Sequence, residues 1–427
     1  MKGIGGRNNM EEWEKIKISD IGHVVTGKTP RTSIKENYGG YIPFLTPSDD
    51  LSNKFAPITN KALTDKGLTE VRNCLLPKNS ICVSCIGSDL GKVVMLKKPT
   101  VTNQQFNSII PNENYSPDFV YYLMIIVGKR LNFLSKTSTA VPIINKSTFS
   151  NFEVEVPSCL HNQTQIAKIL SSLDDKIELN NRINANLEEQ AQALFRRWFV
   201  DFEFPNEQGL PYKSNGGAFV DSELGEIPKG WKIGCIGDYC KVKSGFAFKS
   251  NWWTDKGVKV IKIKNINSDN TLNINDCSYV SEDIALLAKD FYVSDGDLLI
   301  AMTGATIGKF TIVVSNEKDL LVNQRVGKFF LGEKPLKKLP FIYNALKQNK
   351  ISETIINKGQ GSAQPNISSN DIESIEIPYS SNILIKKFNE TCYPLLYQII
   401  HNQKQNMELT QLRDTLLPRL MNNQIKI

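Results

Sequence analysis

The chain has 427 residues, of which 22% are charged and 41% are apolar, and its formal net charge is +7. This length fits two or more domains, the composition is that of a folded globular protein, and the mild basic excess permits an anionic partner without requiring one. The longest apolar run, residues 119–127, is too short to cross a bilayer, and residues 1–12 lack the apolar core of a signal peptide, so we expect a cytoplasmic protein with no membrane partner.

The first motif along the chain is GHVVTGKT, residues 22–29, which fits the phosphate-binding pattern G-x-x-x-x-G-K-[ST]. A phosphate-binding loop needs a buried strand before it and a helix after it. Residues 15–21 alternate as a half-exposed strand does, and Pro30 disfavours helical geometry at Thr29. We therefore interpret the match as accidental and predict that Lys28 lies in a turn.

Cysteines and histidines give no sign of a catalytic or metal site. Cys82 and Cys85 have metal-like spacing, but they lie on an apolar strand and no second pair accompanies them, so we expect packing thiols. The three histidines lie far apart in the sequence. We predict no catalytic residue and no metal ligand in this chain.

The chain contains an internal repeat with a shift of about 220 residues. Matching pairs include Trp13 and Trp231, Gly27 and Gly245, Gly91 and Gly308, Asn103-Gln104 and Asn323-Gln324, and Pro157 and Pro378. The lysine of the phosphate-binding pattern is lost in the second copy, where Phe246 takes the place of Lys28. The repeat predicts two similar domains.

Each copy has a globular part followed by a long helix. The globular parts, 12–157 and 219–378, consist of short β segments with one clear helix each, near 116–134 and 336–356, which predicts α+β domains. The helical parts are 158–202 and 379–427, and residues 203–218 connect the copies.

The two helical parts carry matching coiled-coil seams. The first seam is Ile166, Leu170, Leu173, Ile177, Asn180, Asn184, Leu187, Ala191, Leu194 and Trp198; the second is Phe388, Cys392, Leu395, Ile399, Asn402, Asn406, Leu409, Arg413, Leu416 and Leu420. Each seam has two asparagines at its centre, so we expect the helices to pair with each other. Two helices on separate cores are the alternative.

An antiparallel pair is favoured because the short connector then needs only to turn a corner. The pair would give the molecule a pseudo-twofold axis and hold the domains about 50 Å apart. Pro394 should kink the second helix near its start.

Residues 241–264 hold seven lysines and one acid, with Trp252 and Trp253 among them. Basic residues interleaved with aromatic ones suit a nucleic-acid surface, although a solvated strand face is an alternative. Glutamines in the segment GQGSAQP could read adenine edges or serve only the turn. Our candidates for DNA binding are Lys28, Arg31, Lys249, Trp252, Trp253, Lys262, Lys264, Gln360 and Gln364.

Four segments resemble a known family, the specificity subunits of type I restriction–modification enzymes. They are QTQIAKILSSLDDKIELNNRINANLEEQAQALFRRWFVDF (163–202), LTQLRDTLLPRLMN near the C-terminus, YGGYIPFLTPSDD (38–50) and GSAQPNIS (361–368). The resemblance extends over nearly the whole chain. It implies two target-recognition domains, each reading one part of a bipartite sequence in double-stranded DNA, with two antiparallel helices between them that set the gap.

The resemblance also implies partners. The chain would act as a monomer within a complex, binding two methyltransferase subunits, which endonuclease and translocase subunits join. S-adenosylmethionine, ATP and Mg²⁺ would then belong to these partners and not to this chain. The chain lacks the N/D-P-P-Y/F motif of an adenine methyltransferase, which disfavours a self-contained enzyme. A coiled-coil scaffold with two interaction domains that are not DNA-specific is the alternative function.

The two helices end differently. The first ends in FRRWF, residues 195–199, and the second in LLPRLM, residues 416–421. The two docking surfaces for the methyltransferase could therefore differ in strength.

Overall fold

The computed structural model describes residues 13–87, 90–136, 143–223, 225–360, 365–380 and 382–425, and it confirms the α+β fold. The chain divides into two compact units. Unit 1 runs to Ile177 and also takes in the residues from Glu408 onward, while unit 2 is the stretch Glu178–Met407 between them. Each unit therefore combines one globular part with segments of both long helices.

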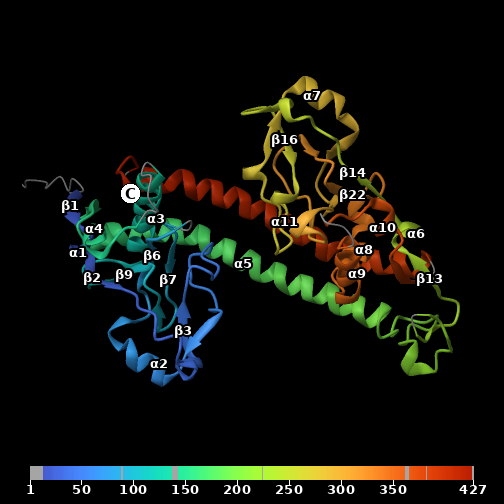
Figure 1. Ribbon diagram of the computed structural model, residues 1–427, viewed down its shortest axis with the longest axis horizontal. Helices are drawn as coiled ribbons and strands as arrows, with labels where there is room; N and C mark the ends of the chain where they lie inside the picture. Colours follow the sequence, from blue (N-terminus) through green and yellow to red (C-terminus); the bar gives the residue numbers. More distant parts are fainter. Residues whose placement is uncertain are drawn as a thin grey trace, which may run out of the picture. The chain divides into compact units, whose positions relative to one another are not determined.

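The globular part of unit 1 contains a strand pair and two four-stranded sheets (Figure 1). The pair is β1 (Trp13–Lys17) with β10 (Glu153–Pro157), the first sheet is β2 (Gly22–Thr26), β9 (Phe106–Pro111), β6 (Ile81–Ser84) and β7 (Val93–Met95), and the second is β4 (Lys61–Leu63), β3 (Tyr38–Leu45), β8 (Thr100–Thr102) and β5 (Leu75–Leu76). Its helices are α1 (Ile18–Ile21), α2 (Asp65–Glu70), α3 (Pro117–Lys136) and α4 (Lys146–Ser150).

Unit 2 has the same plan with additions. The pair is β13 (Lys232–Cys235) with β23 (Glu376–Tyr379), the first sheet is β14 (Lys241–Ser244), β22 (Val326–Phe330), β19 (Leu298–Ala301) and β20 (Phe310–Ile312), and the second is β15 (Trp253–Thr254), β17 (Ser278–Val280), β16 (Val258–Ile261), β21 (Leu320–Val322) and β18 (Tyr292–Val293). Its short helices are α6 (Ile236–Tyr239), α7 (Glu282–Leu287), α8 (Leu339–Leu346), α9 (Asn349–Gly359) and α10 (Ser369–Glu373), and β11 (Phe219–Val220) pairs with β12 (Ile227–Pro228) before them.

The strand orders confirm the internal repeat. In both units the second sheet contains one parallel pair, in which Phe44 faces Val101 in unit 1 and Val260 faces Leu321 in unit 2. The order β2-β9-β6-β7 corresponds strand for strand to β14-β22-β19-β20. The same topology is therefore built twice, and unit 2 adds the edge strand β15.

The long helices α5 (Leu160–Phe199) and α11 (Asn382–Met421) pair antiparallel within each unit, as predicted. In unit 1, Arg413 lies beside Asp174, and in unit 2, Asn402 lies beside Asn184. Every seam residue that the sequence singles out is buried or half-buried. Hydrophobic side chains of both helices also belong to the core of each globular part, which anchors the helix pair to it.

The central asparagines form a short ladder of hydrogen bonds in unit 2. Asn180 Nδ2 donates to Asn406 Oδ1 at 2.8 Å and to Gln405 Oε1 at 2.9 Å. Asn402 Nδ2 donates to Asn184 Oδ1 at 2.8 Å. Because buried amides are costly without partners, these bonds favour one alignment of the two helices over any other.

A phenol–carboxylate pair joins each globular part to α5. In unit 1, Tyr122 of α3 donates to Asp174 at 2.5 Å, and Arg413 Nη1 lies 2.7 Å from the same carboxylate. In unit 2, Tyr343 of α8 donates to Glu188, also at 2.5 Å. Burial, together with the adjacent carboxylate, raises the pKa of both phenols well above the usual value, so both hydroxyls stay protonated donors.

Two elements differ from the sequence predictions. The strand expected over residues 15–21 ends at Lys17, and residues 18–21 form one turn of helix, α1. This turn buries Ile18 and Ile21 completely. The Asp20 carboxylate caps the start of the turn by accepting a hydrogen bond from the backbone amide of Lys17. The helix expected over 336–356 is split into α8 and α9, because Gln348 takes an extended conformation between them.

α11 continues through Pro394 as one helix, and the kink expected at this residue stays a prediction. The side chain of Pro394 is exposed, so its ring lies outside the packed face of the helix. The missing amide leaves only the carbonyl of Glu390 without its helical donor.

Cys82 on β6 and Cys85 just after it are buried packing residues. Burial raises the pKa of Cys82 to about 12 and that of Cys85 to about 11, so neither is a thiolate near neutral pH. Within the described residues no group of three metal-ligating side chains comes together. None of the helices in the described part is long and apolar enough to cross a membrane.

Candidate nucleic-acid interface

The loop after β2 packs directly on the loop between β8 and β9, and we call residues 27–31 with residues 103–105 edge 1. Lys28 N donates to the Thr102 carbonyl at 2.9 Å, and Gly27 N donates to the Phe106 carbonyl at 3.1 Å. A Cβ at Gly27 would lie 2.1 Å from the carbonyl oxygen of Asn103, so only glycine fits there. The two loops therefore hold each other in a fixed position.

Three consecutive side-chain amides, Asn103, Gln104 and Gln105, belong to edge 1. Asn103 is buried, accepts a hydrogen bond from Gln105 N at 3.1 Å and donates to Gln105 Oε1 at 2.8 Å. Thr29 Oγ1 donates to Gln104 Oε1 at 2.6 Å, while the Gln104 side chain is exposed. The arrangement presents the amide of Gln104 to solvent, held by the hydrogen bond from Thr29.

Unit 2 repeats this construction, and we call residues 245–249 with residues 323–325 edge 2. Phe246 N donates to the Val322 carbonyl at 2.8 Å, and Gln324 N donates to the Phe246 carbonyl at 2.9 Å. A Cβ at Gly245 would lie 2.2 Å from the Val322 carbonyl oxygen. Gln324 is exposed at the tip, as Gln104 is at edge 1.

A shallow hollow of about 410 Å³ adjoins edge 2. Its lining is mostly polar and consists of Ser244, Met302, Gln324, Asn366, Ile367, Ser368, Ser369 and Asn370. Amides and hydroxyls are the neutral groups that hydrogen-bond to base edges in DNA grooves. Sequence reasoning missed these side chains, although the repeated Asn-Gln pair was a signal for Gln104 and Gln324.

The structure brings four of the predicted DNA-binding residues of unit 2 together. Lys249 Nζ lies 5.1 Å from the ring centre of Trp252, and Lys262 Nζ lies 3.4 Å from that of Trp253. Partial burial, and secondly the charge of Lys264, lowers the pKa of Lys262. The ring of Trp252 stacks on Phe246 at 6.3 Å, which connects this cluster to edge 2.

Trp252 and Trp253 are half-buried and pack against a hydrophobic core, so they also support the fold. Lys264 is exposed and pairs with Asp276, with 2.9 Å between Nζ and Oδ2. Its ammonium group is therefore shared with a carboxylate and is not directed only to solvent.

The remaining predicted residues have different surroundings. Lys28 is exposed on edge 1. Arg31 pairs with Glu70 at 3.0 Å, and its hydrogen bonds lower the pKa of Glu70 to about 2. Gln360 is exposed just after α9, and the carbonyl of its neighbour Gly359 accepts from the backbone amide of Asn366, which lines the hollow beside edge 2. Gln364 lies outside the described residues.

The backbone of residues 22–34 does not have the geometry of a phosphate-binding loop. Gly22 begins β2, which pairs antiparallel with β9 over Gly22–Thr26, so the first glycine of the pattern lies in a strand and not in a loop. Residues 30–34, all of them described, form no helix that could offer its amides to a phosphate.

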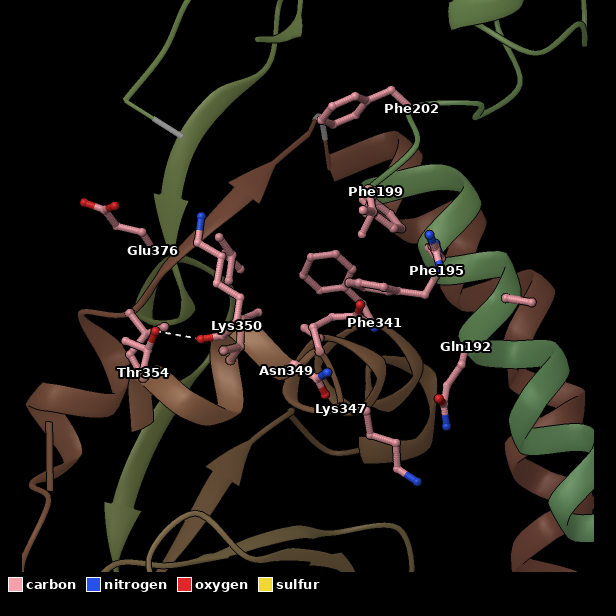
Figure 2. Close-up of a pocket in the computed structure, with 18 of the residues that line it drawn as sticks. Gln192, Phe195, Phe199, Phe202, Phe341, Lys347, Asn349, Lys350, Thr354 and Glu376 are labelled. Atoms are coloured by element: carbon pink, nitrogen blue, oxygen red, sulfur yellow. Dashed lines mark hydrogen bonds between the residues drawn. The ribbon is translucent and has the colours of Figure 1, made fainter. Parts of the chain in front are cut away.

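A separate cavity of about 950 Å³ opens in unit 2 at the end of α5 (Figure 2). Phe195 and Phe199 of α5 meet Phe341 of α8 there, with ring centres 5.8 Å and 5.0 Å apart. Lys350 and Thr354 of α9 lie on another side of the cavity (Figure 2). The three rings are only 5%, 2% and 1% exposed, so they line the cavity as part of the core of unit 2 and do not form an open aromatic surface.

The known proteins most informative for this chain are specificity subunits. The family profile described as "Type I restriction modification DNA specificity domain" matches residues 10–189 and 228–381. The MjaIX specificity subunit of Methanocaldococcus jannaschii is 30% identical over 98% of this chain and 94% of its own length. The HindI specificity subunit of Haemophilus influenzae is 40% identical over 34% of this chain and 32% of its own length.

A solved structure gives the same result for the fold. The type I restriction–modification S subunit from M. genitalium has a TM-score of 0.58 at 19% identity, and the match covers 97% of both chains. The profile match over both repeats, together with the MjaIX relative, shows that the chain belongs to the family of type I restriction–modification DNA specificity domains.

Proposed function

We propose that this specificity subunit reads a bipartite target in double-stranded DNA, with edge 1 reading one half-site and edge 2 the other. One observation carries the proposal: the same pair of loops is built twice, each time with an exposed glutamine at its tip. Paired amides on rigid loops are suited to base edges, and nearby Lys28 and Lys249 are suited to phosphates.

The two long helices would set the gap between the half-sites. Both α5 and α11 are single uninterrupted helices whose residues belong partly to unit 1 and partly to unit 2. A helix of fixed rise is a stiff spacer, and the asparagine ladder fixes its alignment.

Catalysis would belong to partner subunits. As a specificity subunit the chain is not itself the enzyme; the complex would include two methyltransferase subunits, together with endonuclease and translocase subunits. S-adenosylmethionine would bind to the methyltransferase, while ATP and Mg²⁺ would serve the endonuclease and translocase. The chain would take part as one copy per complex.

The cavity at the end of α5 supports a methyltransferase docking position in unit 2. It is about 950 Å³, whereas the space lined by Trp13, Ile166 and Leu420 at the end of α11 in unit 1 is about 10 Å³. The two docking positions would therefore differ in depth, which agrees with the different helix ends FRRWF and LLPRLM.

DNA binding by the assembled methyltransferase complex tests the reading role. Gln104→Ala should weaken discrimination at one half-site and Gln324→Ala at the other, each by about 1–3 kcal/mol. Lys249→Gln should instead weaken binding to all sequences and reduce the salt slope by about one. A wild-type complex that binds random and target duplexes equally would show that the chain is a scaffold and not a reader.

Insertions test the spacer role. Four residues added after Asn181 and four after Gln403 should lengthen the helix pair by roughly 6 Å, close to two base pairs, because each helical residue rises about 1.5 Å. Both insertions fall between the two rungs of the ladder, so Asn180–Asn406 and Asn184–Asn402 can each still pair. The gap between methylated half-sites should grow by one or two base pairs; an unchanged gap would exclude the helices as the spacer.

A further inference from the structure

The tips of edge 1 and edge 2 differ at one position. Asn103-Gln104-Gln105 corresponds to Asn323-Gln324-Arg325, 220 residues later. The first two residues are the same in both copies, and the third changes from an amide to a guanidinium.

The backbone around this third position is the same in both units. The Gln105 carbonyl accepts from Cys85 N at 2.8 Å, and the Arg325 carbonyl accepts from Met302 N at 3.0 Å. The backbone amide of each donates to the side chain of the preceding asparagine, at 3.1 Å for Gln105 and 3.3 Å for Arg325. The two side chains therefore begin from equivalent points on equivalent loops.

The two side chains are held differently. Gln105 is half-buried, and its Oε1 accepts a hydrogen bond from Asn103. Arg325 is exposed and makes no ion pair within the described residues, whereas Arg31 and Arg413 both pair with carboxylates. An unpaired guanidinium on a rigid loop keeps its five donors available to a ligand.

We infer that Arg325 reads a guanine in the half-site of unit 2, and that Gln105 gives the corresponding position of the other half-site a preference for adenine. This inference rests on the proposed reading role of the two edges. Guanine presents two acceptors, O6 and N7, to a guanidinium, and adenine presents a donor and an acceptor to an amide. The Oε1 of Gln105 retains a second lone pair for the adenine amino group.

Exchange of the two residues tests the inference, because both side chains begin from loops with the same backbone hydrogen bonds. The variants are Arg325→Gln, Gln105→Arg and the double exchange, each assembled with the methyltransferase. Methylated sites in a randomised plasmid library would be sequenced, and binding to the wild-type target measured. Lys318→Gln is the charge control, since Lys318 is exposed just before β21, at the opposite end of that strand from Arg325.

We expect Arg325→Gln to lose or replace one guanine in one half-site and to weaken binding to the wild-type target by about 10- to 100-fold. Gln105→Arg should introduce a guanine at the corresponding position of the other half-site. The remaining bases and the gap should not change, and Lys318→Gln should keep the wild-type target.

Two results would overturn the inference. Equal weakening of Arg325→Gln on every sequence, with a smaller salt slope, would make Arg325 a phosphate contact. An unchanged recognised sequence in both exchanged variants would place base reading elsewhere. A wild-type complex without any sequence preference would instead refute the proposed function, so the two failures are distinct. Thermal unfolding identifies any exchanged variant that fails to fold. In that case the sequence recognised by the reciprocal variant tests the inference.

Discussion

Replacing Asn402 by alanine tests whether the ladder sets the alignment of α5 and α11. Asn402 is 4% exposed and uses both ends of its amide: it donates to Asn184 at 2.8 Å and accepts from Gln398 at 2.7 Å. Alanine removes both hydrogen bonds and leaves the half-buried oxygen of Asn184 without this donor.

The two lost bonds set the size of the effect. Each contributes about 1 kcal/mol net, so the free energy of unfolding should fall by about 2 kcal/mol. The double variant N184L/N402L should recover this loss, because it leaves neither member of that rung unpaired and places apolar side chains at two seam positions. The same double variant should hold the register of α5 against α11 less strictly. Leucine pairs pack acceptably in several registers, whereas an amide pair forms its hydrogen bond in only one.

Urea unfolding measures the stability, and sequencing of methylated sites measures the spread of gap lengths. Asn186→Ala is the matched control: Asn186 is an exposed asparagine of α5 whose side chain, among the described residues, bonds only to Gln190, and the change should stay within about 0.5 kcal/mol. If N402A were as stable as N186A, or if N184L/N402L kept a single sharp gap length, the Asn184–Asn402 rung would not set the alignment of the two helices.

Three further predictions concern other parts of the molecule. Asp174→Asn should lower the free energy of unfolding of unit 1 by about 2 kcal/mol in urea, because it removes the charge that faces Arg413 inside a largely buried network. The pKa of Glu70 lies at about 2 instead of 4.5 because of its hydrogen bonds from Arg31, so its stabilising contribution is complete above pH 4.5 and disappears as the pH falls toward 2. An acid titration should therefore destabilise the wild type more than Glu70→Gln over this range, and parallel curves would contradict the assignment. Cys159 is exposed, so a thiol reagent at pH 8 should show a fast phase in the native protein that Cys159→Ser removes; an unchanged fast phase would assign it to another cysteine.

The sequence predicted the features that depend on periodicity and on the repeat. The start of α3 followed from Ser116 and Pro117, and Ser116 does accept hydrogen bonds from the first turn. The antiparallel helix pair followed from the matched seams and the short connector. These signals are local, or are repeated along the chain, so a single sequence can carry them.

The sequence could not show which loops meet. Gly27 packs on Asn103, and Gly245 on Val322 and Asn323, because β2 and β14 end beside loops that are far away along the chain. Contact between distant loops leaves no periodic pattern. The repeated Asn-Gln pair was visible, but its exposure at the tip of each edge required the fold. The split at Gln348 was also hidden, since α8 and α9 both have helical patterns.

The interleaved order of the two units has a consequence for synthesis on the ribosome. Unit 2 is one continuous stretch of chain, whereas unit 1 is completed only by the residues from Glu408 onward. Leu417 and Leu420 belong to the same core as Ile166 and Leu170, so the nascent first domain carries an uncovered apolar stripe while all of unit 2 is made. The second domain can thus fold while the first waits for its last helix segment. A premature stop codon just after Met407 would accordingly spare the domain encoded later and leave the one encoded first unfinished.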